Sequence, residues 1–236
     1  MVAFDLGLEQ PDRDRLDARF PWCQVARFNF DGLPAHTRRL EVCAWKPIAI
    51  DDILRERGGL VLWLDCACVI RAPLDAVFEQ IAHDGVLALA GRSPIERWCH
   101  ERTLQFMRVP REHHSVRVRS AGVLGFDASR QAVRDLVREW RRFAQIPECI
   151  APDGASRENH RYDQAILSNL LAAARHDRDI VLGEDEIDIS SSHPVGWVAT
   201  RERVSPWIPL AFDPLVRAGY ALYKAADRAV LRVRER

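Results

Sequence analysis

The sequence predicts an α/β fold, with a mainly parallel sheet and helices on both of its faces. Short apolar runs alternate along the chain with segments of helical periodicity, the order expected when strands are followed by helices that pack on the sheet. The run Leu60–Leu64 is apolar at every position, which is typical of a central strand covered on both faces. A chain of 236 residues can bury a large core without disulfides or metal ions.

Two strands and two helices are predicted before this central strand. Residues 2–4 form a short apolar strand that leaves through Gly7, and residues 23–30 alternate apolar and polar side chains as a strand does. Residues 12–19 alternate charges and predict an exposed helix. Residues 48–57 predict a helix that ends at the glycine pair 58–59, because glycine adopts the backbone angles of a helix C-terminus.

The rest of the chain continues the alternation of strands and helices. Helices with an apolar stripe are predicted over residues 72–82 and 132–144. A third helix is predicted over residues 164–174, with the acidic Asp163 at its start, and a helical excursion and loop over residues 92–114. Strands are predicted over residues 86–90, 121–126, 180–182 and 187–189, and a loop over residues 147–161. These elements make residues 1–205 one domain.

Residues 206–236 differ in composition and predict a C-terminal helical tail. Its apolar positions are interleaved with lysine and arginine, a basic amphipathic pattern. The tail is expected to pack against its own domain or a second subunit, and peripheral membrane contact through this helix is the alternative.

Composition excludes several classes of protein. Lysine plus arginine equals aspartate plus glutamate at 34 each, so nucleic acid is not an expected partner. The six cysteines contain no C-x-x-C pair, which argues against structural zinc and predicts reduced thiols. The sequence shows no secretory signal and no run of 18 apolar residues. The expected location is the cytoplasm, free or peripheral to the inner membrane face.

Polar side chains mark a candidate site at the carboxyl ends of the strands, where ligands bind in open α/β sheets. Asp65 directly follows the central strand. Asn159, His160, Asp163 and Gln164 lie in a loop that leads into a helix N-terminus, a position suited to anions. Asp163 also has the simpler interpretation of an N-cap.

These residues carry a resemblance to the GT-A-type glycosyltransferases, a family that includes glycogenin and bacterial lipooligosaccharide galactosyltransferases. The apolar strand followed by Asp65-Cys66-Ala67 resembles the Asp-x-Asp motif of that family, and Ser120-Ala121-Gly122 resembles its Asn-Ala-Gly strand. Asp163-Gln164 resembles its Asp-Gln helix start, and His193-Pro194-Val195-Gly196 its late His-x-x-Gly motif. The resemblance implies a GT-A-like, Rossmann-like sheet over about residues 1–200.

The resemblance also implies roles for these residues. Asp65 and His193 would hold Mn²⁺ or Mg²⁺ against the donor diphosphate, and Gly122 would lie beside the sugar pocket. Asp163 and Gln164 would act catalytically on the donor sugar.

Further substrate-binding residues are expected to be Asn159, His160, Arg161 and Lys46. Lys46, between Trp45 and Pro47, otherwise only orders a turn.

The implied function is transfer of a hexosyl group from a UDP- or GDP-sugar to a glycan or lipid-linked acceptor, in surface polysaccharide or glycolipid synthesis. The chain departs from the family at Ala67, which replaces the second carboxylate, and in having no strand and helix before residues 2–7. Both departures favour an alternative, a non-catalytic GT-A-like domain that binds a sugar nucleotide, a glycan or a protein. A third alternative is a metal-independent transferase that uses Arg161 or Lys46 as its cation.

Overall fold

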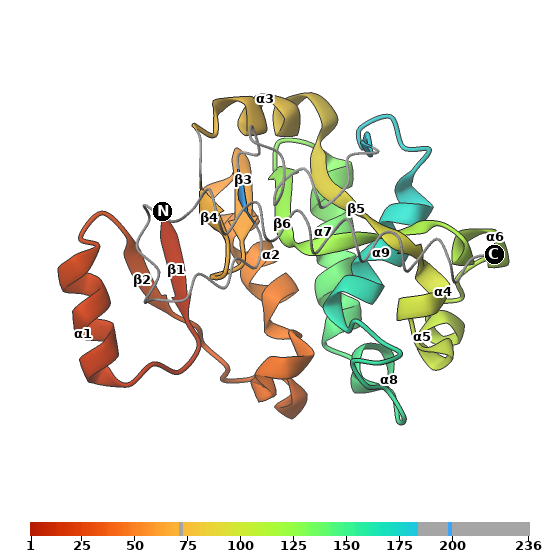
Figure 1. The fold of residues 1–236 in the computed structure, drawn as a ribbon, viewed down its shortest axis with the longest axis horizontal. Helices are drawn as coiled ribbons and strands as arrows, with labels where there is room; N and C mark the ends of the chain where they lie inside the picture. The colour runs from red at the N-terminus through yellow and green to blue at the C-terminus, as the bar shows by residue number, and fades with distance from the viewer. Residues whose placement is uncertain (71–72, 184–197, 200–236) are drawn as a thin grey trace, which may run out of the picture.

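The structure is a computed structural model that describes residues 1–70, 73–183 and 198–199 (Figure 1). The strands are β1 (Val2–Asp5), β2 (Gln24–Arg27), β3 (Leu60–Leu64), β4 (Val69–Ile70), β5 (Val86–Pro94), β6 (Arg117–Asp127) and β7 (Val198–Ala199). The helices are α1 (Gln10–Arg19), α2 (Trp45–Arg57), α3 (Asp75–Asp84), α4 (Ile95–Trp98), α5 (Glu101–Phe106), α6 (Arg111–His114), α7 (Gln131–Ala144), α8 (Pro147–Ile150) and α9 (Asp163–Ala174), with the 3₁₀ turns η1 (Ala35–Arg38) and η2 (Leu40–Val42).

The predicted α/β class is confirmed, and the pairing of the strands corrects the expectation of a mainly parallel sheet. The largest sheet in the described residues has the order β3-β6-β5, and β6 runs antiparallel to both neighbours. Gly125 of β6 pairs with Leu62 on one side and Leu87 on the other. Strands β3 and β5, which flank α3 in the sequence, therefore run in the same direction. The strand-and-helix alternation predicted this shared direction but did not reveal the strand between them.

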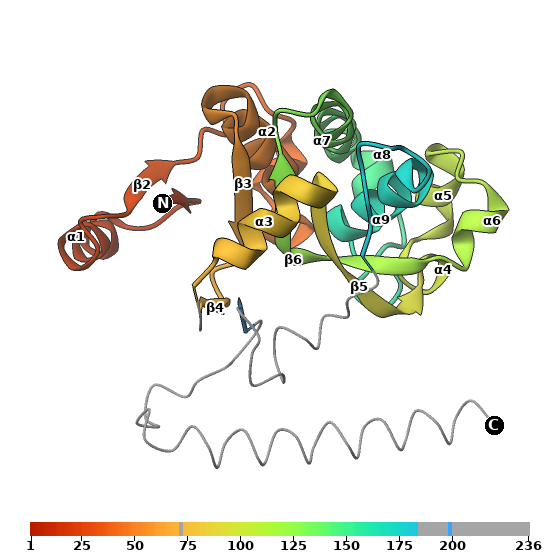
Figure 2. The ribbon, with the colours of Figure 1, turned by 90° about the horizontal axis from the view of Figure 1, so that it is seen from above.

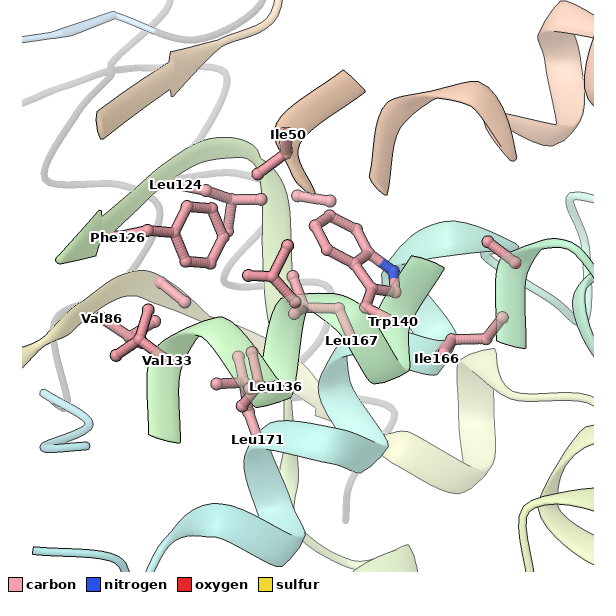
Figure 3. Packing of buried hydrophobic residues seen from close by; sticks show 14 of the residues in the cluster. Ile50, Val86, Leu124, Phe126, Val133, Leu136, Trp140, Ile166, Leu167 and Leu171 are labelled. Atoms are coloured by element: carbon pink, nitrogen blue, oxygen red, sulfur yellow. The ribbon is translucent and has the colours of Figure 1, made fainter. Parts of the chain in front are cut away.

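Helices cover both faces of this sheet, as predicted (Figures 1 and 2). Helices α2, α7 and α9 pack on one face, where their apolar stripes meet alternate residues of β5 and β6. Helix α3 covers the other face, and its Val77 and Ile81 pack against Leu87 of β5. The main core lies between β6 and the first group of helices. Figure 3 shows Trp140 of α7 at its centre, beside Ile50 of α2, Leu124 of β6 and Leu167 of α9.

Strand β3 is less buried than its sequence indicates. It lies at the edge of the three-stranded sheet, and its five apolar residues are half-buried or exposed. The expectation of a central strand covered on both faces is thus wrong for the described residues. An unbroken apolar run does not distinguish a central strand from an edge strand that packs against aromatic side chains on its open side. Here Trp63 stacks on Phe4 of β1, with 6.1 Å between the ring centroids.

The N-terminal segment forms a small unit beside β3. Strands β1 and β2 pair in parallel, and α1 connects them without burying any of its own residues. The carboxylate of Asp5 ends β1 by accepting hydrogen bonds from the backbone N–H groups of Gly7 and Leu8. Its other oxygen pairs with Arg27 of β2 at 2.9 Å. This buried carboxylate fixes the turn out of β1.

Two further expectations are wrong, and three others lie outside the described residues. Residues 180–182 are not a strand, because the backbone there bonds to Asp177 and Asp84 and not to a neighbouring strand. Helix α2 begins at Trp45, three residues earlier than predicted, since Pro47 is tolerated in the first turn of a helix. The predicted strand 187–189, the domain boundary at residue 205 and the tail 206–236 lie outside the described residues. No helix in the described part is long and apolar enough to cross a lipid bilayer.

We expect Gly125→Ala to lower the free energy of unfolding by about 1–3 kcal/mol, because the added methyl group would overlap Ile81 and lie 2.9 Å from Leu87 Cβ. Gly122→Ala on the same strand is the matched control. Its methyl group would meet nothing nearer than 3.4 Å, so its stability should change by less than about 1 kcal/mol. Urea unfolding of both variants measures the difference, and an equal loss in the two would contradict the packing of α3 on β6.

Candidate functional site around Asp65

The carboxylate of Asp65 is held in a fixed orientation at the end of β3. Its backbone N–H donates to the carbonyl of Gly122 at 2.9 Å, which continues the pairing of β3 with β6 by one residue. Its Oδ1 accepts a hydrogen bond from the indole nitrogen of Trp63 at 2.9 Å and lies 2.9 Å from the ammonium of Lys46. The side chain is 39% exposed. Asp65 therefore presents its carboxylate to solvent from a rigid position.

Lys46 lies behind this carboxylate and is almost fully buried, at 4% exposure. It extends from the first turn of α2, and its Nζ donates to the carbonyl of Ala121 at 3.1 Å. The same nitrogen lies 3.6 Å from Oδ2 of Asp163 and 5.9 Å from the centre of the Trp63 ring. A charged ammonium can be buried at low cost only when oxygen atoms surround it, and this arrangement supplies them.

Asp163 is the first residue of α9 and connects the site to the core. Its backbone carbonyl accepts a 2.9 Å hydrogen bond from the indole of Trp140. The N-cap position belongs to Tyr162, whose φ of 47° is unusual for a bulky residue, so the N-cap interpretation of Asp163 is wrong. The Asp163 side chain is buried, and its Oδ2 has no hydrogen-bond partner among the described residues. This oxygen is closed off from solvent and lies 3.6 Å from the ammonium of Lys46.

Burial and neighbouring charges shift the pKa values of this pair. Burial by itself would lower the pKa of Lys46, but the negative charges of Asp163 and Asp65 outweigh it and raise that pKa, so the ammonium stays charged. Burial raises the pKa of Asp163 to about 6, because the single charge of Lys46 only partly offsets the loss of water and the repulsion from Asp65. Asp163 is thus easier to protonate than an exposed aspartate.

Gly122 lies beside the second oxygen of Asp65. A Cβ atom at this position would lie 3.4 Å from Asp65 Oδ2 and 3.8 Å from the hydroxyl of Ser120. Positions 120 and 122 lie on the same face of β6, because alternate residues of a strand share a face. Asp65 Oδ2 and the hydroxyl group of Ser120 therefore both lie close to Gly122.

The predicted residues in the loop before α9 make contacts within the protein. His160 is fully buried, its Nδ1 accepts from the N–H of His100, and its Nε2 lies 2.9 Å from the carbonyl of Ile150. Burial lowers its pKa to about 4, so the ring is neutral and both nitrogens bond to backbone. The expectation that His160 binds substrate is corrected, because it holds two chain segments together and leaves no ring nitrogen for a ligand.

Asn159 and Arg161 also make contacts of their own. Asn159 is exposed and closes its loop through hydrogen bonds with Ser156 and Gly154. The guanidinium of Arg161 lies 4.0 Å from the centre of the Trp98 ring, a cation–π contact. Gln164 is half-buried next to Asp163 in α9. The structure therefore unites Lys46, Asp65, Gly122 and Asp163, and it gives Asn159 and Arg161 contacts with other parts of the chain.

The described residues do not fit the divalent cation that the family resemblance implies. Within residues 1–70, 73–183 and 198–199, no group of three or more histidine, cysteine, aspartate or glutamate side chains could hold a metal ion. The ammonium of Lys46 already lies between the two carboxylates of the site. Burial raises the pKa of the Cys68 thiol to about 11, so it is protonated and a poor ligand. His193 lies outside the described residues, and its role stays a prediction.

Two groups at the site were not predicted. Trp63 precedes Asp65 by two residues, so both side chains lie on the same face of the strand. That spacing was a usable signal for an indole that donates to the carboxylate. The carbonyl of Ala121 left no signal, because every residue has one and only the pairing of β3 with β6 places it beside Lys46.

Comparisons with known proteins give a distant likeness. No family model matches the chain, and no curated protein matches it in sequence. Among solved structures, the apo crystal structure of mouse xyloside xylosyltransferase 1 is similar, with 13% sequence identity and a TM-score of 0.36. The match covers 74% of this chain and 68% of that chain. A likeness at this level carries no argument about chemistry, which rests on the residues around Asp65.

We expect the proton on Asp163 to stabilise the fold in mildly acidic solution. Its folded pKa of about 6 lies above the ordinary 3.8, so the folded state binds more protons between these values and gains stability as the pH falls from 7 to 4. Relative to Asp163→Asn, the wild-type free energy of unfolding should rise by on the order of 2 kcal/mol over that range. Urea unfolding of both proteins at each pH measures it. A difference that is flat or falls toward pH 4 would contradict the burial of this carboxyl group.

Proposed function

We propose that the chain transfers a hexosyl group from a nucleotide sugar at the site around Asp65. The observation that supports this most is convergence. Asp65, Gly122 and Asp163 were singled out by separate motifs spread over about a hundred residues. In the fold the two carboxylates meet around one ammonium group, and Gly122 lies beside Asp65. Structural ion pairs are common, but this one leaves Asp65 partly open to solvent beside a glycine. That combination of rigidity and access is typical of a binding site.

The site has groups suited to the chemistry of glycosyl transfer. Such a reaction needs the donor sugar held in one orientation, which carboxylates achieve by accepting hydrogen bonds from its hydroxyl groups. The outer oxygen of Asp65 is available for this, because the Asp65 side chain is 39% exposed. Asp163 is buried behind it, and its carboxyl group lies 3.6 Å from the ammonium of Lys46. We assign Asp65 to sugar binding, and Asp163 to holding Lys46 and Asp65 in position.

The donor, the acceptor and the binding site in this proposal are supported by different observations. Donors of the UDP- or GDP-sugar type, and acceptors such as a surface polysaccharide or glycolipid, are supported only by the resemblance to GT-A-type enzymes. Binding at Asp65 is supported by the geometry of the site, and is therefore the part to test first.

Binding without transfer is the second candidate, and one observation favours it. Lys46 uses its hydrogen-bond donors inside the protein, and Ala67 stands where the second carboxylate of the family motif would be. Transfer requires positive charge at the departing diphosphate. A chain that keeps the sugar-binding groups but neutralises no leaving group would bind a sugar nucleotide and release it unchanged.

We expect the full chain to bind a member of a panel of UDP- and GDP-sugars by calorimetry, and to release the nucleoside diphosphate when an acceptor is present. Asp65→Asn should weaken binding or lower turnover by about 10-fold to 100-fold, the loss of one hydrogen bond to a charged group. Asp153→Asn is the matched control, because that carboxylate is 99% exposed and lies in a different loop.

The outcomes separate the two candidates. Binding that depends on Asp65 but gives no turnover with any acceptor would establish the binding domain. No calorimetric binding across the whole panel, with and without Mn²⁺, would rule out both.

A further inference from the structure

Lys46 occupies a position lined by oxygen atoms from three separate elements. Its Nζ lies 2.9 Å from a carboxylate oxygen of Asp65, 3.1 Å from the carbonyl of Ala121 and 3.6 Å from a carboxylate oxygen of Asp163. Carboxylate and carbonyl oxygens are the ligands that hard divalent cations such as Mn²⁺ prefer. The same oxygen atoms are here directed at an ammonium group. Lysine and a metal ion cannot both occupy this position.

Burial and charge both hold Lys46 in this arrangement. The side chain is 4% exposed, and the negative charges of Asp163 and Asp65 keep it charged. Removing one partner of such a buried cluster costs about 3–5 kcal/mol, so the protein itself holds the ammonium in place.

The charges of the cluster decide which part of a donor can approach it. One ammonium and two carboxylates sum to −1 when Asp163 is ionised and to zero when it is protonated. A diphosphate placed against Asp65 would be repelled, or at best not attracted, without a metal ion between them. A sugar hydroxyl carries no charge and donates a hydrogen bond to a carboxylate oxygen. The open oxygen of Asp65 therefore suits a hydroxyl group better than a phosphate.

We propose that Lys46 is the resident cation of this site, so that the sugar of the donor binds Asp65 directly, through a hydroxyl group, and no divalent metal ion connects Asp65 to the diphosphate. The identity of the ligand rests on the proposed function, whereas the occupation of the cation position by Lys46 does not. Lys46 acts here as a positioning residue. It orients Asp65 from behind and does not touch the donor.

The first experiment measures the cation position without any ligand. Mn²⁺ binding to the full chain is followed by electron paramagnetic resonance, and the wild type and Asp65→Asn should bind equal amounts, since no Mn²⁺ reaches Asp65. Lys46→Met removes the ammonium and keeps the length of the side chain. This variant should bind one more Mn²⁺ per chain than the wild type, because the freed carboxylates become ligands. Adding Asp65→Asn to Lys46→Met should abolish the gain.

Two outcomes of this experiment would overturn the inference. One is a wild-type Mn²⁺ site that Asp65→Asn removes. The other is a Lys46→Met chain that is folded by circular dichroism and gains no Mn²⁺. Should Lys46→Met fail to fold, the comparison of the wild type with Asp65→Asn still decides whether Asp65 binds a metal ion.

The second experiment identifies the group that Asp65 contacts. For a nucleotide sugar that binds the wild type, Asp65→Asn should weaken its affinity by about 10-fold or more. The affinity of the matching nucleoside diphosphate should change by no more than about twofold. EDTA should change neither affinity of the wild type by more than about twofold, since no metal ion is exchanged. Equal weakening of both ligands, or loss of binding in EDTA, would overturn the inference. If no nucleotide sugar binds at all, the proposed function fails while the Mn²⁺ measurements still test the cation position.

Discussion

The buried ammonium of Lys46 constrains more of the structure than any other polar group in the site. An ammonium with 4% exposure is stable only if several oxygen atoms surround it, and here they come from the end of β3, the middle of β6 and the start of α9. The first turn of α2 must point at that junction, so the position of the helix is fixed at the same time. Asp65 and Asp163 are thereby held at a separation that neither would adopt alone, since two carboxylates repel each other.

The apolar core supports this polar junction from one side. Trp140 is fully buried among side chains of α2, β6 and α9, and its indole N–H reaches out of that core to the carbonyl of Asp163. The start of α9 is therefore fixed by packing. The free-energy cost of the positive φ of Tyr162 is offset by the burial of side chains in the core. Figure 3 shows this tryptophan between helix and sheet. Stability of the core and geometry of the site are linked through one hydrogen bond.

Local patterns in the sequence predicted most elements but few of the contacts between them. The stripe of α7 and the start of α9 follow from residues a few positions apart, and the structure has both. The antiparallel place of β6 between β3 and β5 depends on residues far apart in sequence, and no periodicity reveals it. His160 shows the same limit at the site. Its position near a helix start suggested a ligand-binding residue, whereas distant backbone groups of His100 and Ile150 occupy its ring.

Ala67, where the Asp-x-Asp motif that this segment resembles has a second carboxylate, is consistent with the lysine in physical terms. A divalent ion carries two positive charges and needs several anionic oxygens, so a second acid near Asp65 would stabilise it. An ammonium carries one charge, and Asp65 and Asp163 already exceed it by one negative charge when both are ionised. Burial is the main cause of the raised pKa of Asp163, and the repulsion from Asp65 adds to it. A third carboxylate would increase the negative excess further. Alanine at position 67 adds no charge, and it therefore suits a site whose cation is the lysine at position 46.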